Sequence, residues 1–164
     1  MLWRAYELRP EPVPTLDPDG EYLHRVWGAA VYPLAERLGM TLRLPPVQPR
    51  SRLAHEAGYW AREHGRFDDW NAAVFRAFFE RGEDIGQPAV LSALAMTLGL
   101  DGDTLIDVLA QQRHLAAVLD DERLAQRLGV SGVPAFIANR RVAASGVQSI
   151  DALEQLVARA RAMP

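Results

Sequence analysis

Apolar residues recur at intervals of three and four over most of the chain, and this spacing predicts helices. From Glu21 to Leu38 they share one face, Gly39 supplies a stop, and the internal Pro33 should bend the helix. The same spacing predicts five more helices between Ser51 and Leu128. These are Ser51 to His64, a helix capped by Asp68 or Asp69 that ends at Gly82, a helix with Pro88 in its first turn that ends at Gly99, a helix capped by Asp103, and roughly His114 to Leu128.

Strand patterns occur near the two ends of the chain. Leu2 to Leu8 alternates loosely between aromatic or aliphatic and other residues, which predicts a short strand. Ala135 to Ala138 and Val142 to Ser145 are separated by three residues, too few for a crossover helix, so they should form an antiparallel hairpin. We expect this hairpin to lie against Leu2 to Leu8. A final helix should follow from Ser149, which is a natural N-cap.

Composition narrows the function classes. The 164 residues are 49% hydrophobic and 24% charged, as in an ordinary globular domain with one good core. A net charge of -3 and a pI near 5.8 provide no basic surface for phosphates, so nucleic acid is not an expected partner. With neither a leader pattern nor an apolar run of bilayer length, we expect a cytoplasmic protein without membrane contact. The chain has no cysteine, and therefore no thiol nucleophile, disulfide or thiolate metal site.

The other chemistry-bearing residues favour structural roles. The four histidines lack the short helical spacing of metal ligands, and His55 is interpreted as a packed or capping residue. The paired acids should be caps or solvated charges, and an aromatic stripe that begins at Trp70 should be core. The turn Gly146-Val147-Gln148 could present N–H groups to an anion, but a simple N-cap turn is favoured. The histidines are His24, His55, His64 and His114, the acids are Asp68-Asp69, Glu83-Asp84 and Asp120-Asp121-Glu122, and the stripe is Trp70, Phe75, Phe78 and Phe79. No catalytic or metal-binding residue is assigned.

The block from Gly129 to Gln148 is the most informative stretch. Pro134 opens the first strand of the hairpin, and a proline at a strand mouth marks an edge, a bulge or a cis peptide bond, because it cannot donate a ladder hydrogen bond. Val133-Pro134 is the candidate bond.

Several stretches together resemble the DsbA family of thioredoxin-like proteins, in particular its cytosolic FrnE-like branch. They are Trp3-Arg4-Ala5-Tyr6-Glu7-Leu8-Arg9-Pro10, Arg52-Leu53-Ala54-His55-Glu56 with Trp60-Ala61, Ala77-Phe78-Phe79-Glu80-Arg81-Gly82-Glu83-Asp84-Ile85, Gly129 through Phe136, and Ser145-Gly146-Val147-Gln148. The resemblance implies an α/β fold, thioredoxin-like, with an inserted all-helical subdomain. Residues 1–20 and 129–164 would form the thioredoxin-like core, and residues 21–128 the insertion with its connecting helix.

The resemblance also implies a binding site. In that family the matching proline is cis, and the residue before it pairs through its backbone with an extended substrate or glutathione beside a Cys-x-x-Cys. By position, Pro134 would be the cis-proline and Val133 the docking residue. The cis bond would turn the Val133 peptide outward, where its N–H and C=O are available for strand-like pairing.

The sequence departs from the family in one respect. The family core begins with a strand and a Cys-x-x-Cys helix before the strand that matches Leu2 to Leu8, so the first core strand is missing here. Either the start is placed too late, or a short form has lost its thiol chemistry. We expect the first, because the missing strand is central and its loss exposes unpaired backbone groups on its neighbours.

The resemblance therefore implies a thiol-disulfide oxidoreductase or isomerase that is inactive as written. One alternative is a glutathione-linked relative, such as a kappa-class transferase or hydroxychromene-carboxylate isomerase, for which glutathione would be the cofactor. Another is a non-catalytic peptide- or partner-binding module. The expected partners are an extended peptide or glutathione at the Val133-Pro134 loop, and a second copy of the chain through open strand edges.

Overall fold

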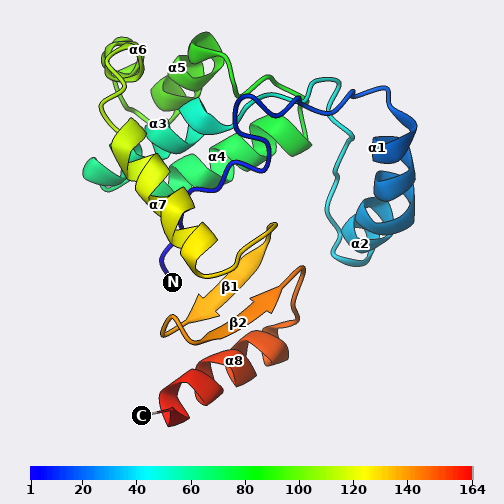
Figure 1. The fold of residues 1–164 in the computed structure, drawn as a ribbon. Coiled ribbons are helices and arrows are strands. Elements are labelled where there is room, and N and C mark those ends of the chain that lie inside the picture. The colour runs from blue at the N-terminus through cyan, green and yellow to red at the C-terminus, as the bar shows by residue number, and fades with distance from the viewer. Residues whose placement is uncertain (164) are drawn as a thin grey trace. The chain divides into compact units, whose positions relative to one another are not determined.

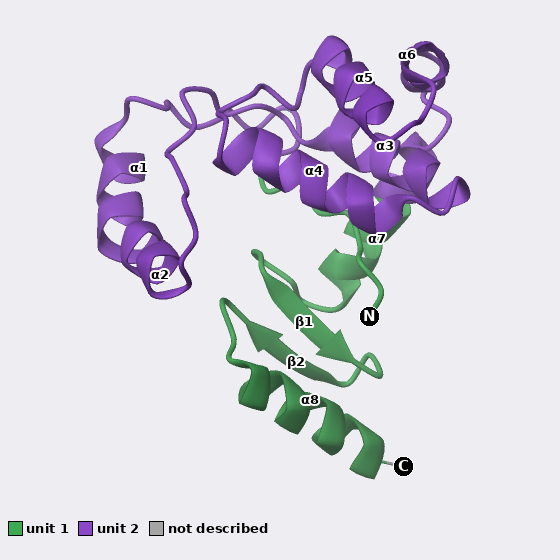
Figure 2. Ribbon diagram, turned by 180° about the vertical axis from the view of Figure 1, so that it is seen from behind, with its two compact units in different colours: residues 1–8, 119–164 green, residues 9–118 purple. Residues whose placement is uncertain are grey.

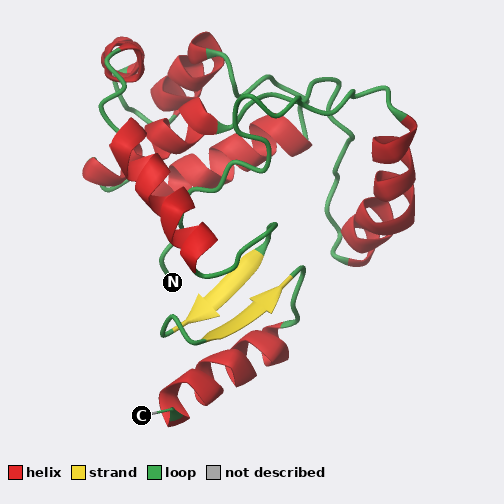
Figure 3. Cartoon of the chain, viewed as in Figure 1, coloured by secondary structure: helices red, strands yellow, loops and turns green. Residues whose placement is uncertain are grey.

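The structure is a computed structural model that describes residues 1–163, most of them in helices (Figures 1 and 3). The helices are α1 (Glu21–Val26), α2 (Tyr32–Arg37), α3 (Arg52–Glu63), α4 (Phe67–Phe79), α5 (Pro88–Thr97), α6 (Gly102–Ala110), α7 (Leu115–Arg127) and α8 (Ile150–Ala162), and the strands are β1 (Ala135–Ala138) and β2 (Val142–Ser145). Two compact units divide the chain: residues 1–8 with 119–164, and residues 9–118 (Figure 2). None of the helices within residues 1–163 is long and apolar enough to cross a membrane.

The unit of residues 9–118 is built on an apolar core between helices α3 to α6. Trp60 and Trp70 are both buried there, and the indole Nε1 of Trp70 donates to the Ala54 carbonyl at 3.4 Å. The interpretation of Trp70 as core is confirmed, and the predicted helical block from Ser51 to Leu128 contains no strand in the described chain.

Helices α1 and α2 form an arm of the same unit. A π-helical turn, Trp27–Val31, joins them, and in it the Tyr32 N–H donates to the Trp27 carbonyl. Because Pro33 has no N–H, the regular ladder is interrupted next to this turn. Trp27 is buried, and its ring centroid lies 6.2 Å from that of Phe79 on α4, so this contact joins the arm to the helical core.

Two predicted helix caps are wrong. Arg66 is the N-cap of α4, and Asp68 and Asp69 lie inside its first turn. At α6 the cap is Asp101, whose carboxylate accepts the Asp103 N–H at 3.0 Å. In both cases the helix begins earlier than the apolar spacing suggests, so an acid chosen as cap falls within the first turn, where it still complements the helix dipole.

The hairpin of β1 and β2 is antiparallel, as predicted, with Ala135 opposite Ser145 and Ala138 opposite Val142. Asn139 and Arg140 in its turn have φ values of 51° and 57°, a left-handed pair that matches the twist of a hairpin. The Asn139 amide Nδ2 donates to the Ala160 carbonyl at 2.8 Å, which fastens the turn to the end of α8.

Helix α8 covers the hairpin with an apolar face that includes the buried Leu156 and Ala160. Ser149 is its N-cap, as predicted, and the hydroxyl oxygen accepts the Ala152 N–H at 3.2 Å. The cap sets where α8 begins, and thereby the length of the loop that follows β2.

The prediction of a strand at Leu2 to Leu8 is wrong. Residues 2–8 belong to no helix or strand, and the sheet contains only β1 and β2 in the described chain. A strand requires a hydrogen-bonded neighbour. The neighbour that the family resemblance places beside Leu2 to Leu8 is not among the 164 residues, and the hairpin does not take its place.

Candidate functional site

The loop before β1 carries the two residues singled out from the sequence. The Val133–Pro134 peptide bond is cis, as is Glu11–Pro12. The Pro134 carbonyl accepts the Gly146 N–H at 2.8 Å, so Pro134 extends the hairpin by one residue. Val133 is 51% exposed, and none of the described residues makes a hydrogen bond with its backbone. Pro134 is therefore bonded to the residue that follows β2, whereas the backbone of Val133 has no hydrogen-bond partner in the described chain.

The bond from Gly146 to Pro134 also fixes which groups of β1 face outward. In an antiparallel pair, residues alternate between hydrogen-bonded and non-hydrogen-bonded positions. Since Pro134 opposite Gly146 is a hydrogen-bonded pair, Ala135 and Ile137 occupy non-hydrogen-bonded positions, and their N–H and C=O groups point away from β2. Together with Val133 they form the outer edge of β1, which has no hydrogen-bonded partner in residues 1–163.

The outer edge of β1 belongs to the unit of residues 1–8 and 119–164. In Figures 1 and 2, β2 and then α8 lie on one side of β1, while the last turns of α7 and residues 1–8 lie on the other. The edge of β1 that points away from β2 therefore faces part of the same unit. That part contains no strand that could pair with β1.

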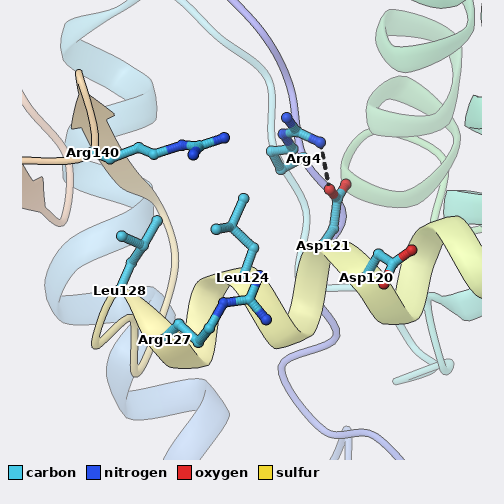
Figure 4. Close-up of a pocket in the computed structure, with 7 residues that line it drawn as sticks. All are labelled: Arg4, Asp120, Asp121, Leu124, Arg127, Leu128 and Arg140. Carbon is cyan, nitrogen blue, oxygen red and sulfur yellow. Dashed lines mark hydrogen bonds and ion pairs between the residues drawn. The ribbon is translucent and has the colours of Figure 1, made fainter.

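The far end of this unit's hairpin contributes to a cavity of about 450 Å³, which we term the arginine pocket (Figure 4). Its lining residues are Arg4, Asp120, Asp121, Leu124, Arg127, Leu128 and Arg140. Figure 4 shows the Arg140 side chain extending from the end of β1 toward Arg4 and Leu124. The volume lies within the range of small-ligand sites.

The acids of the arginine pocket are already paired. One oxygen of Asp121 accepts from Arg4 Nη1 at 2.8 Å, and the other accepts the Ala5 N–H at 2.9 Å. Asp120 is joined to Arg123 at 2.5 Å. By contrast, Arg127 and Arg140 have no ion-pair or hydrogen-bond partner in the described chain, so two guanidinium groups are left to set the charge of the cavity.

The prediction that Asp120-Asp121-Glu122 are caps or solvated charges is wrong for Asp121. Its side chain is 2% exposed, against 72% for Asp120. Asp121 follows the buried Val118 by three positions on α7, so it lies on the buried helix face. That spacing is the sequence signal for burial of Asp121. No such signal brings the pocket arginines together, because Arg4, Arg127 and Arg140 are far apart in the sequence.

None of the histidines lies in the Val133–Pro134 loop or lines the arginine pocket. His64 contacts the Trp60 carbonyl through Nδ1 at 2.8 Å, and His114 Nε2 lies 3.6 Å from a Glu63 carboxylate oxygen. Burial lowers the pKa of His114 below its usual value, although Glu63 acts in the opposite direction. Within residues 1–163, no three histidine or acidic side chains gather closely enough to hold a metal ion.

The predicted apolar stripe of α4 is core at Trp70 but not throughout, since Phe75 is 45% exposed. Val147 follows Gly146, which bonds to the Pro134 carbonyl, and it is 68% exposed. Gln148 Nε2 donates to the Ser145 carbonyl at 2.8 Å within the same turn. An exposed apolar side chain thus stands next to the residue that pairs with Pro134.

Comparison with known families decides the assignment: the profile of the DSBA-like thioredoxin domain matches residues 1–158. The chain belongs to the DsbA family. It is 33% identical over 143 residues to the uncharacterised protein YwbO of Bacillus subtilis, covering 82% of this chain and 70% of that protein.

Solved structures agree with the family. A probable DsbA oxidoreductase from Streptomyces coelicolor superposes with a TM-score of 0.75 at 25% identity, over 96% of this chain and 74% of that one. A candidate protein disulfide isomerase from Nitrosomonas europaea gives 0.64 at 20% identity, over 85% and 74% of the two chains, and shows the fold alone. The fold is thioredoxin-like, with mostly helical content, as predicted. This sequence contains no cysteine.

Proposed function

We propose that this chain binds extended peptides through the backbone of Val133 in the Val133–Pro134 loop, as the substrate-binding part of a DsbA-family thiol-disulfide oxidoreductase of the FrnE-like branch. The observation that carries the proposal is the exposed Val133, whose backbone makes no hydrogen bond with any described residue. An extended peptide satisfies these backbone groups by strand-like pairing with Val133. The exposed Val133 and Val147 would favour apolar residues in the bound peptide.

Thiol chemistry requires a thiolate that attacks one sulfur of a substrate disulfide and forms a mixed disulfide, with the second substrate sulfur leaving as a thiolate. No residue of this sequence can supply the attacking sulfur. The cysteines would have to come from residues outside these 164, and the relatives are longer, since the chain covers 70% of YwbO and 74% of the Streptomyces protein. The proposal therefore separates binding, which this chain performs, from turnover, which it does not.

The binding half is tested with a labelled, unstructured peptide of eight apolar and β-branched residues, titrated with the 164-residue chain and followed by fluorescence anisotropy. Val133→Pro removes the N–H that pairs with the peptide, while leaving every β1–β2 hydrogen bond in place. Ala143→Pro is the matched control, because the Ala143 N–H points out of the opposite edge of the hairpin. We expect Val133→Pro to weaken binding at least about tenfold, the equivalent of roughly 1.4 kcal/mol, and Ala143→Pro to leave it unchanged.

N-methylated peptides test the same backbone pairing without any change to the protein. Methylation should abolish binding only at the peptide residue whose N–H pairs with the Val133 carbonyl, and should be tolerated at the other residues. A uniform response along the peptide, or equal losses in the two proline variants, would refute pairing with Val133.

The expected lack of catalytic turnover is tested separately, with an insulin-reduction assay. The purified chain should not accelerate reduction of insulin by dithiothreitol, while binding the peptide normally. Glutathione is included as a competitor, since the glutathione-linked alternative requires it to displace the peptide at millimolar concentration; failure to do so would favour the peptide over glutathione as the ligand.

A further inference from the structure

The turn that joins β2 to α8 holds the Val133–Pro134 loop through one backbone hydrogen bond (Figure 1). Because Pro134 has no N–H, only its carbonyl can pair with the opposite segment, and this carbonyl accepts the Gly146 N–H at 2.8 Å. Residues 131–133 make no hydrogen bond in the described chain. The direction of the Gly146 N–H therefore decides where the loop, and with it the backbone of Val133, is held.

The Gln148 side chain fixes that direction from the opposite side. Its amide Nε2 donates to the Ser145 carbonyl at 2.8 Å and to the Gly146 carbonyl at 3.2 Å. The Ser145 carbonyl and the Gly146 N–H belong to one planar trans peptide unit, in which the two groups point in opposite directions. A donor on the carbonyl side and an acceptor on the N–H side thus hold the plane of this unit between them.

The turn has few other restraints of its own. Gly146 has a φ of 78°, in the left-handed region that glycine adopts without steric cost, and glycine is also the residue whose backbone rotates most freely. Val147 is 68% exposed, so packing of its side chain restrains the turn little. The half-buried Gln148 amide, which bonds two successive carbonyls, supplies the restraint that these residues lack.

From these contacts we propose that Gln148 is a positioning residue for peptide binding. It orients the Ser145–Gly146 peptide unit so that the loop presents the backbone of Val133 to the peptide. The inference rests on the proposed function, in which the peptide pairs with Val133. The hydrogen bonds on the two sides of the peptide unit run in series and strengthen one another, so loss of the Gln148 donor should weaken the bond to Pro134.

Two substitutions separate this role from a general contribution to stability. Gln148→Met keeps the length of the side chain and removes both donated hydrogen bonds. Gln148→Glu places a carboxylate against two carbonyl oxygens at neutral pH, and protonation at lower pH restores one O–H donor. Gln155→Glu is the matched control for the added charge, because Gln155 is an exposed glutamine of α8 in the same unit. Circular dichroism melting checks that each variant is folded.

The anisotropy titration with the peptide described above measures the effect on binding. Gln148→Met should weaken binding about three- to tenfold, which corresponds to the loss of a neutral hydrogen bond. Gln148→Glu should weaken binding more at about pH 7.5 and regain affinity between about pH 6 and pH 4, as the new carboxyl group is protonated. Gln148→Met and Gln155→Glu should keep the pH dependence of the parent chain. A residue that only stabilised the fold would give no selective recovery at low pH.

Amide hydrogen exchange, followed by NMR without any peptide, tests the turn independently of the proposed function. The Gly146 N–H should exchange faster in Gln148→Met than in the parent chain. The N–H of Ala144, which lies opposite Phe136 at a hydrogen-bonded position of the hairpin, is the internal control and should not change.

The outcomes distinguish the inference from the proposed function. Unchanged exchange at Gly146, or a Gln148→Glu variant whose affinity does not recover at low pH, would overturn the positioning role while peptide binding by the parent chain stands. Faster exchange with unchanged affinity would show that Gln148 orders the turn but does not position Val133. If the parent chain binds no peptide, the proposed function and the positioning role are both wrong, whatever the exchange at Gly146.

Discussion

Arg4 and Asp121 are 117 residues apart in the sequence and form an ion pair of 2.8 Å. The Asp121 carboxylate is 2% exposed, while Arg4 is 48% exposed. The second oxygen of Asp121 accepts the N–H of Ala5 at 2.9 Å. One buried carboxylate thus binds a side chain and a backbone group of the extended N-terminal segment, and ties this segment to α7 without any ladder hydrogen bond.

Asp121→Asn should destabilise the chain by about 1–3 kcal/mol, because one acceptor oxygen becomes a donor that faces an existing donor. Asp120→Asn is the neighbouring control: its carboxylate is 72% exposed, and an exposed pair contributes about 0–1 kcal/mol. Urea unfolding followed by circular dichroism measures both. Equal losses in the two variants would show that the Arg4–Asp121 pair has no special role.

Gly102→Ala should destabilise the contact between α5 and α6. A Cβ at Gly102 would overlap the Ser92 hydroxyl oxygen and lie 2.9 Å from the Ser92 carbonyl, and Ser92 is itself buried. Overpacking of this kind costs about 1–3 kcal/mol. Gly28→Ala serves as control, since no atom lies within 4 Å of the added carbon. A melting temperature of Gly102→Ala equal to that of the parent would contradict the close approach of the two helices.

Local signals in the sequence predicted much of the fold. The sequence identifies Ser149 as a cap because this role depends only on the next few residues, and Trp70 as core because the apolar period places it on a buried face. The hairpin followed from strand length and spacing. The strand prediction for Leu2 to Leu8 is wrong, because a strand depends on a partner that is distant in sequence. Alternation alone does not provide that partner.

The candidate site was predictable only in part. Val133 and Pro134 were identified by family resemblance and by the position of a proline at a strand mouth. The outward groups of Ala135 and Ile137 required the register, which is fixed by the bond from Gly146 to Pro134. The arginine pocket could not be predicted, because Arg140 enters it through a left-handed turn whose orientation depends on a contact with α8.

Stability should fall as the pH drops below the usual His114 pKa of 6.5. Burial lowers the pKa in the folded chain, so below 6.5 the unfolded chain binds more protons than the folded one, and protonation favours unfolding. The nearby charges are Glu63, which favours the protonated ring, and Arg113, which opposes it. His114→Gln should flatten the dependence between pH 7 and about pH 5, as followed by urea unfolding at each pH, and the exposed His24→Gln should not. A parent whose stability is constant over that range would contradict the shift.

The free outer edge of β1 should make the chain self-associate, because unpaired strand edges pair readily with a second copy. Sedimentation equilibrium at rising concentration should show a mass that climbs from 18.2 kDa toward twice that value. Ala135→Pro should remain monomeric, because the outward N–H of Ala135 is lost, whereas Ala143→Pro should still associate, since its N–H lies on the other edge. The extended peptide should dissociate the dimer by occupying the same groups. A monomer at every concentration, or loss of association in Ala143→Pro instead, would show that this edge does not pair between chains.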